Sequence, residues 1–215
     1  MLLFEAREQV VHYGKELVRR GLATGSFGNV SMYIPEGKVL VISPSGMEYE
    51  RVTPADVVVL TEDNVQLEGS RKPSSEIELH RALYRSRPDV LAVVHTHSPY
   101  ATTMACMGKP LRPLHYAAGY AGGEVPCIPY VPFGTAELAE AAARGMGPAR
   151  NAVLLGGHGL VSVGPDLAFA MDVAEQMEFL AQICWRCEVA GGGVPLSDAH
   201  VAQAAAALKG YRQKP

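Results

Sequence analysis

The sequence lacks the features that mark membrane-spanning, secreted and nucleic-acid-binding proteins. Its longest apolar runs fall far short of the roughly 20 residues that a transmembrane helix needs, so we expect no membrane partner. The net charge is −3 and no basic block is present, which argues against a nucleic-acid partner. The N-terminal segment becomes charged at Glu5, which is typical of an amphipathic helix and not of a signal peptide. These absences predict a cytoplasmic protein.

Cysteine is also scarce. The chain has 215 residues and four cysteines, which show no disulfide framework, and this fits a reducing compartment. Cys184 and Cys187 form a Cys-x-x-Cys pair, a spacing found in metal and redox sites. The pair lies inside a long helical pattern and no second pair accompanies it, so we interpret it as two small buried residues at helical spacing.

Hairpins alternate with helices along the chain, without repeats, linkers or low-complexity stretches. Apolar runs bounded by turn residues predict strands at about 30–34, 38–42, 57–61, 65–67, 90–94, 152–155 and 160–163. Helical periodicity and caps predict helices at about 3–20, 75–86, 98–107, 134–146, 166–189 and 197–210, and the segment 110–133 is expected to form loops with short strands. Few strands are joined by helical crossovers. We therefore expect an α/β (α+β-like) fold, with one layered domain over 1–215 and a central, mostly antiparallel sheet flanked by helices.

Two polar loops and a helix start have the composition of anion-binding sites. The glycines of Gly25–Asn29 would let backbone N–H groups converge, although an ordinary turn is the alternative, and Ser43–Gly46 is a weaker second case. Ser75 is expected to be an N-cap, with Glu78 as its capping-box partner. Hydroxyls and free N–H groups at the positive end of a helix favour an anion at this third position.

Two histidines one residue apart close an apolar run. Because side chains alternate along a strand, His95 and His97 are predicted to project from one face. Glu76 lies upstream, and His158 lies downstream in a Gly-Gly-His-Gly segment. Three imidazoles and one carboxylate form a donor set that suits zinc. The alternative is a group of core or surface histidines with ordinary hydrogen bonds.

Seven segments together resemble a known family. They are GSFGNVS (25–31), ISPSG (42–46), KPSSE (72–76), VVHTHS (93–98), HYAAGYAGG (115–123), PYVPFGT (129–135) and LLGGHGL (154–160). In this order they resemble the class II, zinc-dependent sugar-phosphate aldolases of the L-fuculose-1-phosphate aldolase type. Related members are L-ribulose-5-phosphate 4-epimerase and the methylthioribulose-1-phosphate dehydratases.

The resemblance implies a role for each matching position. It implies one zinc ion per chain, with Glu76, His95, His97 and His158 as ligands. Glu76, Tyr116 and Tyr211 match catalytic positions: an acid/base, a tyrosine that reaches a neighbouring subunit's site, and a tyrosine on the C-terminal tail. The substrate and its phosphate would be held by Gly28, Asn29, Ser45, Gly46, Ser74 and Ser75, with Phe133 as an adjoining aromatic wall. The resemblance also implies a homotetramer with active sites between subunits.

The expected function is retro-aldol cleavage of L-fuculose 1-phosphate, or a close ketose 1-phosphate, to dihydroxyacetone phosphate and L-lactaldehyde. An epimerase or a dehydratase on the same scaffold is the alternative, but the family's epimerases carry Asp where this chain has Glu76. Gly157 stands where some aldolases have a second histidine, which leaves the sugar preference open. A non-catalytic scaffold like the adducin head is a further alternative, which the complete set of metal ligands argues against. The remaining His12, His80 and His200 are expected to be solvated or partly packed.

Overall fold

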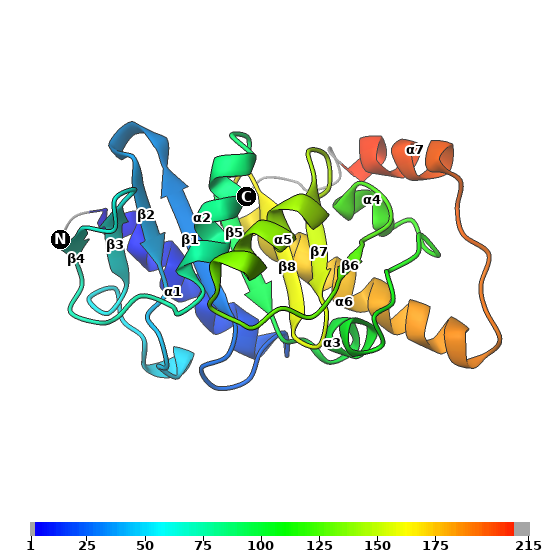
Figure 1. Cartoon of the computed structure of the whole chain (residues 1–215), viewed down its shortest axis with the longest axis horizontal. Coiled ribbons are helices and arrows are strands. Elements are labelled where there is room, and N and C mark those ends of the chain that lie inside the picture. Colours follow the sequence, from blue (N-terminus) through cyan, green and yellow to red (C-terminus); the bar gives the residue numbers. More distant parts are fainter. Residues whose placement is uncertain (1–2, 209–215) are drawn as a thin grey trace.

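The computed structural model describes residues 3–208, so the proposed catalytic Tyr211 lies outside the described residues. Within that range the strands form one eight-stranded sheet with the order β4-β3-β2-β1-β5-β8-β7-β6 (Figure 1). Neighbouring strands are antiparallel, except that β6 pairs parallel with β7. The strands are β1 (Asn29–Ile34), β2 (Val39–Ile42), β3 (Val58–Thr61), β4 (Gln66–Glu68), β5 (Ala92–Thr96), β6 (Cys127–Ile128), β7 (Ala152–Leu155) and β8 (Gly159–Gly164).

Helices cover both faces of the sheet. The α-helices are α1 (Phe4–Arg19), α2 (Ile77–Ser86), α3 (Pro99–Cys106), α4 (Ala118–Ala121), α5 (Ala136–Met146), α6 (Leu167–Val189) and α7 (Asp198–Leu208), and the 3₁₀ turns are η1 (Pro35–Gly37) and η2 (Tyr49–Arg51). α2 and α5 pack side by side on one face, while α1, α3 and α6 cover the other (Figure 1). The short α4 packs against α7 and α6. The architecture is therefore a three-layer sandwich.

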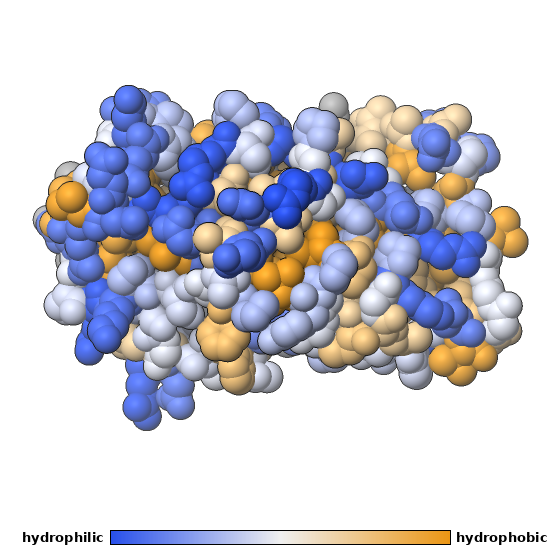
Figure 2. All heavy atoms as spheres, viewed as in Figure 1, coloured by the Kyte–Doolittle hydropathy of each residue, from blue (hydrophilic) through white to orange (hydrophobic). Residues whose placement is uncertain are grey.

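The two cores follow from the alternation of side chains along the strands. In β2, Val39 and Val41 join the core under α1 and α6, whereas Leu40 and Ile42 join the core under α2 and α5. Strands covered on both faces need continuous apolar runs, and the predicted strands 90–94 and 152–155 have them. The surface differs: hydrophilic side chains cover much of the α2–α5 face, with hydrophobic ones gathered near its centre (Figure 2). None of the helices within 3–208 is long and apolar enough to span a bilayer.

The predicted fold class is confirmed, with a mostly antiparallel sheet flanked by helices. Four local details differ from the expectations. The helix expected at Ser75 begins at Ile77, with Glu76 in the N-cap position and no side-chain cap, so the Ser75–Glu78 capping box is wrong. The strand ending in the histidine pair runs to Thr96, and α4 lies in a segment expected to hold only loops and short strands. Of the Cys-x-x-Cys pair, only Cys184 is fully buried.

Candidate active site

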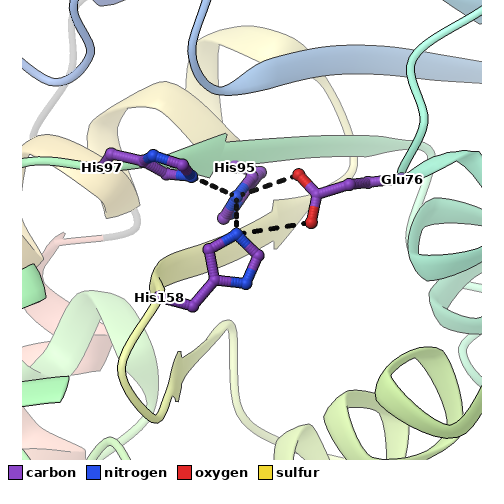
Figure 3. Close-up of side chains that lie close together, drawn as sticks. All are labelled: Glu76, His95, His97 and His158. Carbon is purple, nitrogen blue, oxygen red and sulfur yellow. Dashed lines mark hydrogen bonds and ion pairs between the residues drawn. The ribbon is translucent and has the colours of Figure 1, made fainter. Parts of the chain in front are cut away.

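Four side chains from distant parts of the sequence converge at one end of the central strands (Figure 3). The Nε2 atom of His95 lies 2.9 Å from that of His97 and 3.2 Å from that of His158. The Glu76 carboxylate completes the group, with Oε2 at 3.2 Å from His95 Nε2 and Oε1 at 3.4 Å from His158 Nε2. The predicted ligand set is thus assembled in space.

Backbone elements explain why these four side chains meet. His95 lies near the end of β5, and His97 follows two residues later on the same face. His158 lies in the tight turn between β7 and β8, which pairs directly with β5. Glu76 occupies the N-cap position of α2. A turn, a strand end and a helix start therefore supply the ligands around one point.

The positions of the four ligand atoms fit a cation with tetrahedral coordination. Bonds of about 2.0–2.1 Å to nitrogen or oxygen would separate neighbouring ligand atoms by about 3.3 Å, close to the four distances observed. His95 Nδ1 lies 2.9 Å from the carbonyl of Leu160, so the neutral ring carries its proton there and its Nε2 lone pair faces the centre. Glu76 Oε1 is buried and makes no hydrogen bond to any described residue. Lone pairs facing one another need a positive charge between them.

The electrostatics keep His97, His158 and Glu76 in the protonation states that bind a cation. Burial and the neighbouring histidines lower the pKa of His97 to about 3 and that of His158 to about 4, so both rings are neutral at pH 7. Burial opposes ionisation of Glu76, but the charges of His95 and His158 and its hydrogen bonds outweigh burial and lower its pKa. Burial likewise lowers the pKa of His95, yet the adjacent Glu76 carboxylate outweighs it and raises that pKa.

A cavity of about 240 Å³ opens beside the cluster. It is bordered by Glu76, His97 and His158 together with all the residues expected to hold the substrate phosphate. These are Gly28, Asn29, Ser45, Gly46, Ser74 and Ser75, and Phe133 also lines the cavity, as expected of an aromatic wall. Phe27, which sequence reasoning did not assign, stacks on the His97 ring with centroids 5.5 Å apart. The polar loops and the cluster thus share one opening.

Tyr49 connects two of these loops through its hydroxyl group. Its buried hydroxyl lies 3.1 Å from the carbonyl oxygen of Gly28 and 3.2 Å from the Oγ of Ser43. Burial raises the pKa of Tyr49 to about 12, so the hydroxyl remains a donor. Backbone hydrogen bonds from Ser45 to Lys72 and from Ser74 to Ser43 tie the second loop to the third. The three loops therefore form one connected unit.

The sequence analysis missed a residue behind the cluster. His80 was expected to be solvated or partly packed, but its side chain is 0% exposed, and that expectation is wrong. Its Nε2 lies 2.5 Å from Asn29 Oδ1, and Asn29 donates through Nδ2 to Glu76 Oε2 over 2.9 Å. The spacing of Glu76 and His80, four residues apart on one helix face, was the available signal. His12 and His200 are exposed, as expected.

Tyr116 does not line the cavity that contains the cluster. It is 57% exposed and borders a separate hollow of about 620 Å³ with residues of α7. Neighbouring His115 accepts a hydrogen bond from the backbone of Ala117. An exposed tyrosine away from its own chain's cavity matches the expectation that it serves a neighbouring subunit, and that role stays a prediction.

Comparison with known proteins gives one consistent result. Residues 8–185 match the family model described as Class II Aldolase and Adducin N-terminal domain. The 5-deoxy-D-ribulose 1-phosphate aldolase of Bacillus thuringiensis serovar kurstaki is 44% identical over 214 residues, covering 100% of both chains. The 5-methylthioribulose-1-phosphate/5-deoxyribulose-1-phosphate aldolase of Rhodospirillum rubrum is 38% identical over 182 residues, covering 84% of this chain and 80% of that protein. A solved structure of L-fuculose 1-phosphate aldolase has a TM-score of 0.91 at 35% identity, covering 95% of this chain and 96% of that chain.

Proposed function

The chain belongs to the class II aldolase family, and we propose that it cleaves a deoxyketose 1-phosphate into dihydroxyacetone phosphate and a short aldehyde, with zinc as its metal. The observation that carries the proposal is the cavity shared by the metal-ligating cluster and the phosphate loops. A substrate with a phosphate at one end and two adjacent oxygens beyond it would fit both parts at once. One zinc ion per chain would be held by Glu76, His95, His97 and His158.

The proposed reaction breaks one carbon–carbon bond. The C4 hydroxyl gives its proton to a base of the protein, the C3–C4 bond electrons pass to the three-carbon fragment, and C3 then takes up a proton from the protein, so no proton is gained or lost overall. Zinc, when bound, supplies a Lewis acid for the negative charge on that fragment. We assign the proton at C3 to Glu76, because its carboxylate reaches the centre of the site and lies at the cavity. Tyr116 of a neighbouring chain is the proposed group at the aldehyde oxygen.

We propose 5-deoxy-D-ribulose 1-phosphate as the first substrate to test, which would yield acetaldehyde. The support is the 44% identity over the whole chain to an aldolase of that name. L-Fuculose 1-phosphate, which would yield L-lactaldehyde, is the second candidate, supported by the close match to a solved aldolase of that name. The methyl terminus that the two sugars share is the chemistry we expect this site to accept.

A coupled assay for dihydroxyacetone phosphate tests the proposal. The panel should contain these two ketose 1-phosphates, 5-methylthioribulose 1-phosphate, and L-ribulose 5-phosphate as a probe of epimerase activity. We expect release from at least one ketose 1-phosphate, loss of release on chelation, and about one divalent ion per chain in the active protein. Turnover that survives complete metal removal would contradict the metal assignment. Epimerisation or dehydration without release of dihydroxyacetone phosphate would contradict the proposed reaction.

We further propose that the enzyme works as a homotetramer in the cytoplasm. The support for assembly is the exposure of three large aromatic side chains: Phe133 at the cavity, Tyr116 beside α7, and Tyr130 are 68%, 57% and 66% exposed. Side chains of this size are costly to leave in water, and a neighbouring chain would cover them. Sedimentation or native mass measurement gives the oligomeric state directly.

A further inference from the structure

Polar side chains of α2 and β1 form a buried series of hydrogen bonds that begins at Glu76. Glu76, His80 and Tyr84 lie four residues apart on one face of α2, and Asn29 and Ser31 lie two residues apart on one face of β1. We call these five residues the α2–β1 polar chain. Their side chains alternate in the order Glu76, Asn29, His80, Ser31, Tyr84, and none is more than 9% exposed.

Each successive pair of side chains in the α2–β1 polar chain is joined by a hydrogen bond. Asn29 Nδ2 lies 2.9 Å from Glu76 Oε2, and His80 Nε2 lies 2.5 Å from Asn29 Oδ1. On the other side of the ring, Ser31 Oγ lies 2.6 Å from His80 Nδ1 and 2.6 Å from the hydroxyl oxygen of Tyr84. A buried polar group without a hydrogen-bond partner lowers the stability of the fold. The α2–β1 polar chain is therefore stable only when each donor faces an acceptor.

The carboxylate fixes the direction of all these bonds. An ionised Glu76 can only accept, so the NH₂ group of Asn29 must face it and Asn29 Oδ1 must face His80. His80 Nε2 therefore carries a proton and donates it, and Nδ1 is an acceptor. Ser31 then donates to Nδ1 and accepts from Tyr84. The opposite tautomer of His80 would turn the Asn29 oxygen toward the carboxylate, which is repulsive.

We propose that His80 is a positioning residue for Glu76: through the Asn29 amide it holds Oε2 in place and leaves Oε1 directed at the centre of the site. An amide does not relay protons. The α2–β1 polar chain therefore orients the Glu76 carboxylate and does not conduct a proton to it. Burial keeps the ring neutral by lowering the pKa of His80 to about 3, which preserves the single tautomer required. The proposal deepens the proposed aldolase function and rests on it where turnover is concerned.

Two substitutions at His80 separate positioning from packing. H80L removes the donor to Asn29 and leaves the amide free to turn, whereas H80Q keeps an N–H group at the same side-chain length. The matched control is Ser162→Ala. Ser162 on β8 is, like His80, fully buried, but its hydroxyl donates to the backbone oxygens of Val94 and Ala170 and not to a residue of the α2–β1 polar chain. It measures the cost of deleting a buried polar group elsewhere in the sheet.

Three measurements follow. In the parent protein, ¹⁵N NMR of the imidazole should show the Nε2–H tautomer of His80, and this requires neither a variant nor activity. In H80L, zinc affinity by chelator competition, or kcat, should fall about 10–100-fold with little change in KM. H80Q should recover much of that loss, and Ser162→Ala should keep the parent values of both.

Three results would overturn the proposed role of His80. An Nδ1–H tautomer in the parent protein would overturn the proposal, whether or not the variants fold. So would a folded H80L with the zinc affinity and kcat of the parent, or equal losses in H80L and H80Q. If the parent protein cleaves no ketose 1-phosphate, the proposed function fails, while the tautomer and the zinc affinities still test the role of His80.

Discussion

At the scale of single residues, the two oxygens of Glu76 have different surroundings. Oε2 accepts from Asn29 and lies 3.2 Å from His95, while Oε1 has no hydrogen-bond partner among the described residues and lies 3.4 Å from His158. One oxygen is therefore held and the other is available. A carboxylate that is fixed at one oxygen only can bind a cation and still move a proton.

Glu76→Gln separates these two roles. The amide keeps the size and one oxygen but loses basicity, so three histidines should still hold zinc while proton transfer fails. We expect turnover to fall about 10²–10⁴-fold in a folded, metal-containing protein. Zinc content and proton exchange on dihydroxyacetone phosphate should be measured on the same preparation. Exchange at the parent rate with zinc retained would mean that Glu76 is a ligand only and that the base lies elsewhere.

His80 should make stability depend on pH. Burial, and after it the charge of His95, lowers its pKa from 6.5 to about 3, and Glu76 opposes the shift. Between these two values the unfolded chain binds a proton that the folded chain does not, so the free energy of unfolding falls as the pH falls. From pH 7 to pH 5 the expected loss from this group is about 2 kcal/mol.

Denaturant unfolding at both pH values measures this effect. H80Q should lose about 2 kcal/mol less than the parent over the same pH interval. Glu16 does not interfere: its hydrogen bond with Arg19 and its other arginine contacts outweigh burial and hold its pKa at about 2, so its stabilisation is lost only below pH 4.5. The exposed His12→Gln variant controls for the loss of one imidazole. An identical pH dependence in H80Q and the parent would show that His80 is not the responsible group.

Residue types and spacing predicted the ligands but not their support. His95 and His97 could be placed on one face because a strand has a fixed period of two. The burial of His80 could not be read from its helix alone, because a polar residue on an apolar helix is buried only if the facing strand offers it a partner. That partner, Asn29, is 51 positions away and was interpreted only as a phosphate ligand.

At the scale of elements, the loop before β1 crosses very close to β5. Gly28 has φ +72°, and a Cβ atom there would lie 2.7 Å from the carbonyl oxygen of His95. That oxygen belongs to the backbone, so it cannot move without shifting the strand that presents two ligands. The absence of a side chain at this position lets the phosphate loop and the metal ligands share one cavity.

Gly28→Ala should therefore lower activity by displacing β5 beside His95. A shift of about 1 Å at such a site can cost near 10² in turnover, and we expect a loss of at least about tenfold in kcat/KM. Gly108→Ala is the matched control, because Gly108 has φ +64° but no atom within 4 Å of the added Cβ. Both variants carry a similar backbone strain, of about 1–2 kcal/mol. Equal kcat/KM in the two variants would contradict the close-approach argument.

Element boundaries were predictable where one physical signal dominated. Asp166 caps α6 through the backbone N–H of Phe169, and α6 begins at Leu167, next to the predicted start at 166. The start of α2 was misplaced because Ser75 has the preferred cap chemistry, yet Glu76 takes the N-cap position, where its carboxylate faces the histidines. Ligand placement therefore overrides capping preference there. The four-residue α4 has too few residues to carry a periodic pattern.

At the scale of the whole molecule, the site of one chain is proposed to be incomplete. Glu76 and Phe133 line the cavity, but Tyr116 points its exposed side chain at a different surface, beside α7. If Tyr116 handles the aldehyde oxygen, it must do so in a neighbouring chain. Cyclic assembly would give every chain one such neighbour and close the ring of sites.

Mixing two inactive variants tests this arrangement. Glu76→Gln keeps Tyr116, and Tyr116→Phe keeps Glu76, so each variant alone should have low turnover. In mixed oligomers, a chain with intact Glu76 can lie beside a chain with intact Tyr116, and random assembly would restore about a quarter of the sites. Each variant carried alone through the same dissociation and reassembly is the control, with mixed oligomers verified by native mass spectrometry. Verified mixed oligomers without regained activity would mean that Tyr116 does not complete a neighbour's site, and a monomeric parent protein would exclude sharing altogether.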